Sequence, residues 1–380
     1  MKMLHIIKMD EESVLTTEPA RSDIEWVEPT AAATSPTQEA GPSTAVLSDQ
    51  DVTTWRENGY CLVNDVLPEE LLQRLLQDSQ SVYPAPASEE AAKITDFGGG
   101  VLTFPARYDS VNQLALHGRV LGAVAQLLGE RDAVDIRLTQ AEVWPKYGRS
   151  REKGEAVDEY DNADQRIHCD FPNHSLTHPP TWYQPEAVEM IVYLCDVEQC
   201  SGATAVVARQ GKDDPAYQYP MYQMPGFGLL QWKNNRHLVE SYLRQVDPDI
   251  AHFRATHLYP REKRVRYRFG SVLFYRHDTW HRGTELKAGC LRLVVNMTFK
   301  KATSHWLSQL HVGWAWSMYR PTLQMEKLIA SSSVEQRCVL GFPKPGHSYW
   351  NKDTLLAVAA RYAKLGMDML PYIDACLQQA

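Results

Sequence analysis

Two predicted strands, Val272-Leu-Phe-Tyr275 and Leu291-Arg-Leu-Val-Val-Asn-Met-Thr-Phe299, enclose the segment His277-Asp-Thr-Trp-His-Arg-Gly283. Both are short runs of β-branched, aromatic and other apolar residues, which favour buried strands. Similar runs recur upstream between Gly, Pro and Asp turns, at Val134–Trp144, Val188–Leu194 and Ala203–Val207. Many short strands separated by turns predict a mainly β fold with flanking helices, built on a double-stranded β-helix (jelly-roll, cupin-like) core.

The composition divides the chain into three regions. Residues 1–47 are predicted to be a disordered N-terminal tail, because the breaker-rich stretch from Pro29 to Thr44 lacks apolar periodicity and cannot offset its ordering entropy by burial. Residues 48–300 are predicted to form the jelly-roll domain with its N-terminal helices. Residues 301–380 are predicted to be a helical, Trp-rich C-terminal extension, packed on the core because its aromatic side chains need burial.

Helix signals flank the strands. Ser48 can cap a helix that runs through Trp55, and Pro68 can open a second one. Helical spacing of apolar residues predicts one further helix from Val111 to Leu128. In the extension, the pattern predicts capping boxes at Ser332/Glu335 and Ser333/Gln336 and a helix over Thr354–Leu365.

Charge and cysteine content narrow the class of protein. A net charge of -8 argues against general nucleic-acid binding, and nucleic acid is not an expected partner. No apolar run approaches the roughly 20 residues needed to span a bilayer, so we expect a cytoplasmic protein with no membrane partner. Seven cysteines without a CxxC pair argue against a zinc or disulfide framework. Cys195 and Cys200, the closest pair, are expected to be core and turn residues rather than a redox couple.

A possible metal site begins at His168-Cys169-Asp170. Side chains alternate along a strand, so His168 and Asp170 share one face while Cys169 points away. Two histidines and a carboxylate form a facial triad that leaves coordination positions open on the metal, as in non-heme Fe(II) oxygenases, and His281 is the candidate third ligand. Each residue also has an ordinary interpretation, as a polar strand residue, a turn residue or a loop residue.

The order of the strands favours the metal interpretation. The first pair of ligands precedes two predicted strands and His281 follows two more, and in a jelly roll the second and seventh strands lie side by side. Arg292 follows His281 by eleven residues, on the next strand. Its guanidinium could bind one end of a dicarboxylate whose other end chelates the metal.

These motifs together resemble the phytanoyl-CoA dioxygenase family of Fe(II)/2-oxoglutarate oxygenases. The resemblance, over roughly residues 48–300, is carried by His168-Cys-Asp170, Ser201-Gly202, Phe269-Gly-Ser-Val-Leu-Phe274, Thr279-Trp-His281 and Arg292. It implies iron ligation by His168, Asp170 and His281, and 2-oxoglutarate binding by Arg292. It further implies O2 as a substrate and ascorbate as a reductant. Gln140 and Tyr193 are candidates for further contacts with the co-substrate.

Several positions depart from the family pattern. Ser201 stands where an Asn is usual, Ala208-Arg-Gln-Gly211 replaces a Pro-Gly-Ser-His run, and Gly283 replaces a polar residue. Ile191 lies where some members have a tryptophan near the co-substrate. Tyr193, on the same strand face, could compensate through its hydroxyl or could be a core tyrosine.

Three other features each have two interpretations. The aromatic stretch Tyr217–Gly228 could be a substrate lid or a loop packed for stability. One strand face carrying Arg264, Arg266 and Arg268 could bind an anionic substrate or be a solvated face. His174 and His178 could be ligands of a second metal, but polar loop residues are the more ordinary interpretation.

The sequence therefore predicts an Fe(II)/2-oxoglutarate dioxygenase that hydroxylates or otherwise oxidises a small, partly apolar molecule, releasing succinate and CO2. Retention of Asp170 favours oxygenation over halogenation, because a carboxylate occupies the position that a halide would need. The alternatives are a metal-binding jelly-roll protein of another class and an oxygenase that modifies a macromolecule. The oligomeric state is left open.

Overall fold

The structure is a computed structural model. It describes residues 24–37, 45–94, 102–150, 157–158, 161–170, 182–183, 185–218, 224–225, 230–231, 233–304, 324–347 and 350, and, near the end of the chain, 352, 355, 358–359, 362 and 365–378. Within this part of the chain, every helix is too short or too polar to cross a membrane.

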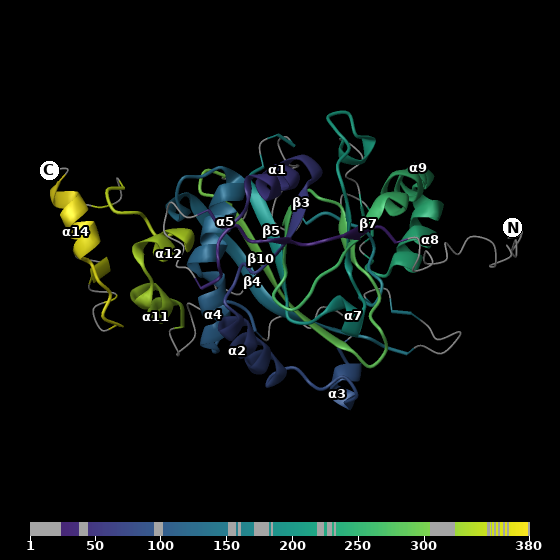
Figure 1. The fold of residues 1–380 in the computed structure, drawn as a ribbon, viewed down its shortest axis with the longest axis horizontal. Helices are drawn as coiled ribbons and strands as arrows, with labels where there is room; N and C mark the ends of the chain where they lie inside the picture. Colours follow the sequence, from purple (N-terminus) through teal and green to yellow (C-terminus); the bar gives the residue numbers. More distant parts are fainter. Residues whose placement is uncertain are drawn as a thin grey trace, which may run out of the picture.

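Two sheets form the centre of the fold (Figure 1). The four-stranded sheet has the order β1 (Trp26–Val27), β7 (Glu262–Val265), β6 (Thr204–Val207) and β9 (His281–Gly283). The six-stranded sheet has the order β2 (Thr30–Ala31), β3 (Tyr60–Asn64), β8 (Val272–Arg276), β5 (Ala187–Tyr193), β10 (Leu291–Lys301) and β4 (Ile136–Tyr147).

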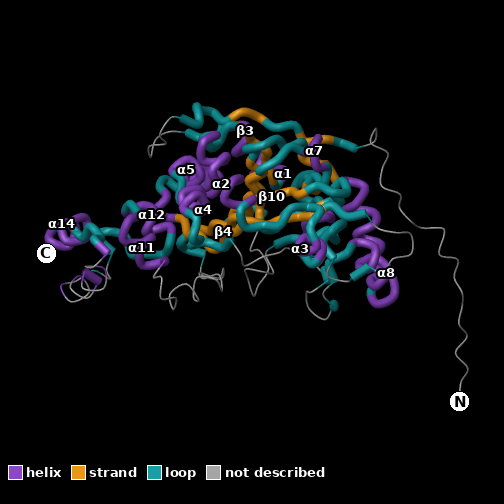
Figure 2. The backbone as a smooth tube through the Cα atoms, turned by 90° about the horizontal axis from the view of Figure 1, so that it is seen from below, coloured by secondary structure: helices purple, strands orange, loops and turns teal. Residues whose placement is uncertain are grey.

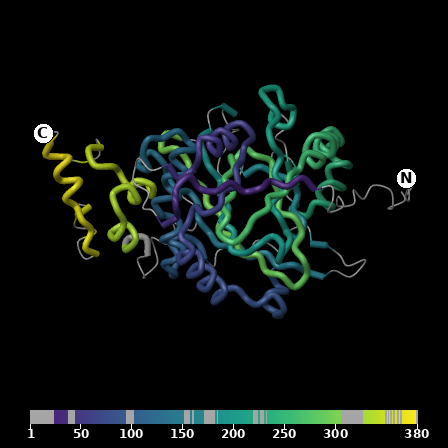
Figure 3. The backbone as a smooth tube through the Cα atoms, in the orientation of Figure 1, coloured from purple at the N-terminus to yellow at the C-terminus, as the bar shows by residue number. Residues whose placement is uncertain are grey.

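The chain crosses repeatedly from one sheet to the other. After β4 it passes through His168, which bridges to β9, and then returns to the six-stranded sheet as β5. β6 and β7 lie in the four-stranded sheet, β8 in the six-stranded sheet, β9 in the four-stranded sheet and β10 beside β4 and β5. Figure 3 traces this return of the green β10 segment to the blue β4 segment. Such a path is a double-stranded β-helix, which confirms the predicted core.

Strand alternation sorts the buried side chains into layers. Along β5, Val188, Met190 and Val192 face outward into a large apolar cluster beneath the helices. Ile191 and Tyr193 face inward, into the cluster between the sheets. A third cluster joins Ile167 and Cys169 to helical residues on the outer side of the four-stranded sheet. Because β5 is covered on both faces, its sequence is continuously apolar apart from Glu189.

Helices cover the outer face of the six-stranded sheet. The chain contains more helix than the predicted "mainly β" class implies, although the predicted fold is correct. The covering helices are α1 (Asp49–Asn58), α2 (Glu69–Gln80), α4 (Asp109–Ala115) and α5 (Gly118–Leu128). Shorter elements are α3 (Glu89–Ala92), α7 (Val197–Cys200), η2 (Ala133–Asp135), η3 (Pro215–Tyr217) and η5 (Tyr259–Arg261). At the ends of the molecule lie α8 (Arg236–Val246), α9 (Pro248–Phe253) and the π-helical η4 (Arg254–Leu258), opposite α11 (Gln324–Ser331), α12 (Val334–Val339) and α14 (Leu370–Leu377) (Figure 2).

Two local expectations need correction. The single helix predicted over Val111–Leu128 is two helices, because the chain leaves the helical conformation at Leu116 and the His117 side chain caps the second helix. The predicted tail of residues 1–47 also contains structure. β1 pairs in parallel with β7, and β2 pairs in parallel with β3. Backbone pairing at the edges of both sheets stabilises Trp26–Ala31, which composition alone marked as a tail.

Where they are described, C-terminal residues pack against the core. Ile329, Val339, Trp350 and Tyr372 are buried in the same apolar cluster as the covering helices. The Ser333–Gln336 capping box opens α12. Trp306, Trp314 and Trp316 lie outside the described residues, as do several residues of the helix predicted at 354–365.

Candidate metal centre and co-substrate pocket

His168 and His281 face each other across two neighbouring strand segments. The His168 amide donates to the His281 carbonyl at 2.9 Å, and the His281 amide donates back to the His168 carbonyl at 2.8 Å. This reciprocal pairing fixes both backbones, and the two imidazole rings lie 4.4 Å apart between centroids. Two histidines separated by more than 100 residues are thereby brought to one point.

Asp170 completes a group of three possible metal ligands. Its Oδ1 lies 3.5 Å from His168 Nε2, and its Oδ2 lies 3.3 Å from His281 Nε2. Ligands in cis positions at about 2.1 Å from one ion are roughly 3 Å apart, so these three side chains fit a single ion. No other such group of His, Cys, Asp and Glu occurs in the described part of the chain.

Backbone carbonyls orient both imidazoles. His168 Nδ1 lies 3.0 Å from the Arg166 carbonyl, and His281 Nδ1 lies 3.0 Å from the Thr279 carbonyl. A proton on Nδ1 that is donated to a carbonyl leaves Nε2 with its lone pair facing Asp170. Burial, followed by the nearby His281, lowers the pKa of His168 to about 3. The imidazole is therefore neutral near pH 7, as metal ligation requires.

Tyr275 holds the carboxylate ligand and was missed by the sequence reasoning. Its hydroxyl donates to Asp170 Oδ2 at 2.9 Å, and its ring lies 4.6 Å from that of His281. Burial and the Asp170 charge raise the pKa of Tyr275, so the phenol keeps its proton and acts as donor. The sequence does contain a signal for this position. Tyr275 follows the core residue Leu273 by two positions on the same strand, so alternation places both side chains on the inward face.

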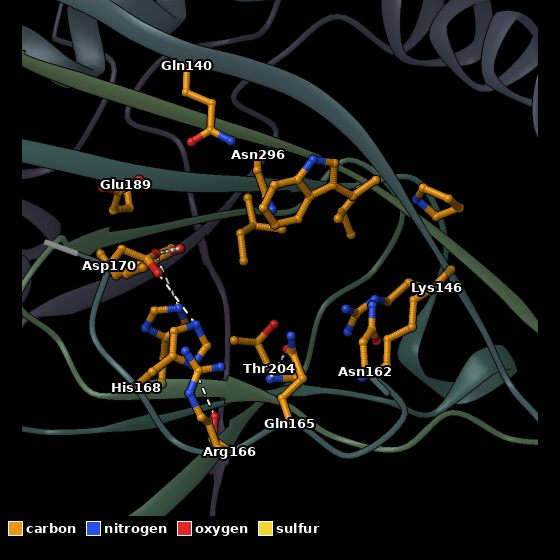
Figure 4. A pocket seen from close by; sticks show the side chains of 18 residues that line it. Gln140, Lys146, Asn162, Gln165, Arg166, His168, Asp170, Glu189, Thr204 and Asn296 are labelled. Carbon is orange, nitrogen blue, oxygen red and sulfur yellow. Dashed lines mark hydrogen bonds and ion pairs between the residues drawn. The ribbon is translucent and has the colours of Figure 1, made fainter. Parts of the chain in front are cut away.

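The three ligands open onto a cavity of about 210 Å³ between the sheets (Figure 4). One end is cationic, with Lys146 and Arg292 on paired positions of β4 and β10. The other end is polar and is formed by Gln140, Glu189 and Asn296. Apolar side chains line the wall between these ends, namely Trp144, Ile191 and Val294. Figure 4 shows Gln140 and Asn296 on one side of the cavity and Lys146 and Asn162 on another.

Arg292 carries buried hydrogen-bonding capacity that the chain does not use. Its Nη1 donates to the Gly202 carbonyl, while its Nε is buried without a hydrogen-bond partner. No ion pair joins it to a carboxylate within the described residues, although the residue is only 7% exposed. A buried guanidinium is costly without a counter-charge, so this end of the cavity suits a carboxylate ligand.

Comparison with known proteins agrees with this arrangement. The phytanoyl-CoA dioxygenase family profile matches residues 55–294, well over half of the chain. The chain belongs to this family. It is therefore a non-heme iron, 2-oxoglutarate-dependent oxygenase, and the triad and the unpaired Arg292 fit iron and 2-oxoglutarate. No curated protein matches the chain.

Solved structures give distant matches. The epimerase SnoN, crystallised with Fe3+, alpha ketoglutarate and nogalamycin RO, is 16% identical with a TM-score of 0.42, over 72% of this chain and 90% of that one. HygX from Streptomyces hygroscopicus, crystallised with nickel and 2-oxoglutarate, is 15% identical with a TM-score of 0.41, over 68% and 88%. The non-heme monooxygenase ThoJ, in a nickel complex, is 14% identical with a TM-score of 0.40, over 68% and 78%.

The two further co-substrate candidates lie in different surroundings. Tyr193 is fully buried, donates its hydroxyl to Thr204 Oγ1 at 2.7 Å and stacks on Tyr267, so it stands behind Thr204 and does not line the cavity. Gln140 does line the cavity, but six residues along β4 separate it from Lys146, which is about 20 Å of extended strand. This position places Gln140 away from Arg292, at the polar end.

The other residues singled out in the sequence have structural roles, as far as they lie among the described residues. Cys169 faces away from the triad, and its thiol donates to the Asp278 carbonyl. Tyr217 and Met224 pack in the same apolar cluster as Cys169, so these two residues of the proposed lid are core residues. Arg266 pairs with Glu28 and Glu198, and Arg268 pairs with Asp65, as expected of a solvated face. His174 and His178 lie outside the described residues.

Proposed function

We propose that this chain oxidises a C–H bond of a small, partly apolar organic molecule, coupled to the conversion of 2-oxoglutarate and O2 into succinate and CO2. One observation carries the proposal. The His168–Asp170–His281 triad and the guanidinium of Arg292, which has no carboxylate partner among the described residues, face the same cavity. A metal ligand set and a carboxylate anchor on one cavity wall are what a chelating 2-oxo diacid requires.

Some of these residues would bind the metal, and others orient the metal ligands or the co-substrate. His168, Asp170 and His281 would hold Fe(II), with Tyr275 fixing the carboxylate and two carbonyls fixing the imidazoles. When bound, iron and 2-oxoglutarate supply the oxidising chemistry. Arg292 binds the distal carboxylate and so orients the 2-oxo acid end toward the triad.

The polar end of the cavity is the proposed site of the primary substrate. Ile191 and Val294 provide apolar contact, while Glu189 and Asn296 provide hydrogen-bonding groups. Burial, followed by the charge of Asp170, raises the pKa of Glu189 and so favours its neutral carboxyl form, a group that can both donate and accept hydrogen bonds. Thr298 donates to one of its oxygens and holds the group in place. These contacts suit a molecule with an apolar body and a hydroxyl or amide.

The proposal is tested by substrate-independent turnover. Purified protein with Fe(II), ascorbate and 2-oxoglutarate should release succinate slowly, and Asp170→Ala should abolish this release. Asp249→Asn, on an exposed position of α9, is the matched control and should match wild type. Binding of 2-oxoglutarate to the protein loaded with a redox-inert metal should be lost in Arg292→Met and kept in Arg244→Met, an exposed position of α8.

A screen of small molecules then identifies the substrate. A true substrate should raise the rate of succinate release and appear as an oxidised product in equal amount. Absence of both succinate release and 2-oxoglutarate binding in the wild-type protein would contradict the proposal and favour a jelly-roll protein of another class.

A further inference from the structure

Lys146 is a buried cation placed directly opposite Arg292. The two residues are register partners on β4 and β10, and both line the cavity. Lys146 is only 5% exposed. Like charges on directly opposed strand positions repel each other, and burial strengthens the repulsion. The pairing is therefore unfavourable unless an anion occupies the space between the two side chains.

No side chain of the described residues supplies that anion. Lys146 Nζ donates to the Thr284 carbonyl at 2.8 Å, and no ion pair joins it to a carboxylate in this part of the chain. Asp164 is the carboxylate whose field acts most strongly on Lys146, but it is already bound by Arg236 and Arg282. Burial, followed by the charge of Arg292, lowers the pKa of Lys146, which is the effect expected of a buried cation without an ion-pair partner.

Gly283 has no side chain, and this leaves room for the ammonium group of Lys146. A Cβ at this position would lie 3.1 Å from Lys146 Nζ and 2.5 Å from Gln165 Oε1. Gln165 Oε1 accepts a hydrogen bond from the Gly283 amide at 2.9 Å, so the absence of a side chain lets both residues approach β9. Any larger residue at 283 would force one of them to move. The glycine thus permits a second cation beside Arg292.

We propose that Lys146 is a second binding residue for the distal carboxylate of 2-oxoglutarate, acting together with Arg292. This inference rests on the proposed function, because it assigns a role within the same co-substrate site. The carboxylate would lie between the two cations and remove their repulsion. The opposite, polar end of the cavity leaves room for the primary substrate, so the co-substrate and substrate groups bind at different ends.

The test compares two ligands that differ only at the distal carboxylate. 2-Oxoglutarate and 2-oxopentanoate share the chelating 2-oxo acid end, but the second lacks the carboxylate. Dissociation constants for both are measured by calorimetry on full-length protein loaded with Zn(II) in place of iron. Lys146→Met should weaken 2-oxoglutarate binding at least tenfold and leave 2-oxopentanoate binding unchanged. Lys287→Met, on an exposed lysine, is the matched control and should bind both like wild type.

A second variant guards against a folding defect. Lys146→Gln removes the charge but keeps a donor for the Thr284 carbonyl, and it should show the same selective loss. If both variants bind 2-oxoglutarate within twofold of wild type, or weaken both ligands equally, the role of Lys146 is overturned while the proposed function stands. If the wild-type protein binds neither ligand, the proposed function itself is overturned, and this inference with it.

Discussion

Replacement of Tyr275 by Phe should weaken metal binding while leaving the fold intact. The substitution removes only the hydroxyl that donates to Asp170 Oδ2 at 2.9 Å. The ring stays in place beside His281, because its packing, 4.6 Å between ring centroids, does not depend on the hydroxyl. The loss therefore falls on the orientation of one ligand and not on the core.

The magnitude follows from the type of contact. A hydrogen bond to a charged acceptor contributes about 1.5–3 kcal/mol. Loss of a group that orients a metal ligand commonly lowers metal affinity by about 10- to 100-fold, which corresponds to roughly 1.4–2.7 kcal/mol. The two estimates agree, so Tyr275→Phe should raise the dissociation constant for Fe(II) or Mn(II) by one to two orders of magnitude. The free energy of unfolding of the metal-free protein should fall by no more than the energy of this hydrogen bond, about 1.5–3 kcal/mol.

Competition with a chromogenic chelator measures the metal affinity, and urea unfolding measures the stability. Tyr83→Phe is the matched control, since its buried hydroxyl donates to the Val143 carbonyl at 2.6 Å, on the far side of the six-stranded sheet. This control should lose comparable stability and no metal affinity. Equal metal affinity in wild type and Tyr275→Phe would refute the idea that this hydroxyl positions Asp170, as would an equal loss in Tyr83→Phe.

Three further predictions concern stability. In the metal-free protein, the unfolded chain takes up a proton at His168 near pH 6.5, but the folded chain does so only near pH 3, so stability falls as the pH decreases below 6.5. Between pH 7 and 5, the free energy of unfolding measured with denaturant should fall by about 2 kcal/mol more in wild type than in His168→Gln. Gly59→Ala should cost roughly 2–4 kcal/mol in the same assay, because φ is +95° and the new Cβ would lie 2.7 Å from Thr279 Oγ1; a loss below 1 kcal/mol would contradict this. Arg337→Met should selectively speed amide exchange in α11 and α12, because its guanidinium donates to the carbonyls of Ile329, Ala330 and Asp368; an unchanged exchange pattern would count against that role.

The fold was readable from the sequence where burial leaves a local pattern. β5 and β10 are buried on most positions, so their apolar runs predicted strands directly. Ser48 and Gly59 mark the two ends of α1 by their capping geometry. β1 and β2 were missed because two-residue strands carry no periodicity. They are held by pairing with β7 and β3, which are more than 30 residues away in the sequence.

The site was readable only in part, for a related reason. The spacing of His168, Asp170 and His281 follows a pattern that alternation and strand order can reveal. Lys146 and Tyr275 have no such pattern, because their importance comes from residues far away in the sequence, namely Arg292 for Lys146 and Asp170 for Tyr275. Lys146 matters because it lies opposite Arg292, and a shift of one residue in the β4–β10 register would turn it to the other face. Register over long sequence distances is what the sequence alone leaves undetermined.

The division of the cavity between the two sheets suggests how this site can change its substrate. The metal ligands come from β9 and the segment that pairs with it, at the four-stranded sheet. Along β10, in the six-stranded sheet, Arg292, Val294 and Asn296 pass from the cationic end to the polar end of the cavity. Asn296, and Glu189 on β5, line the polar end of the cavity and belong to the six-stranded sheet, not to the segments that carry the metal ligands. In the proposed function, the metal centre therefore belongs to one sheet and the substrate-facing wall to the other, an arrangement that allows the same chemistry to act on different molecules.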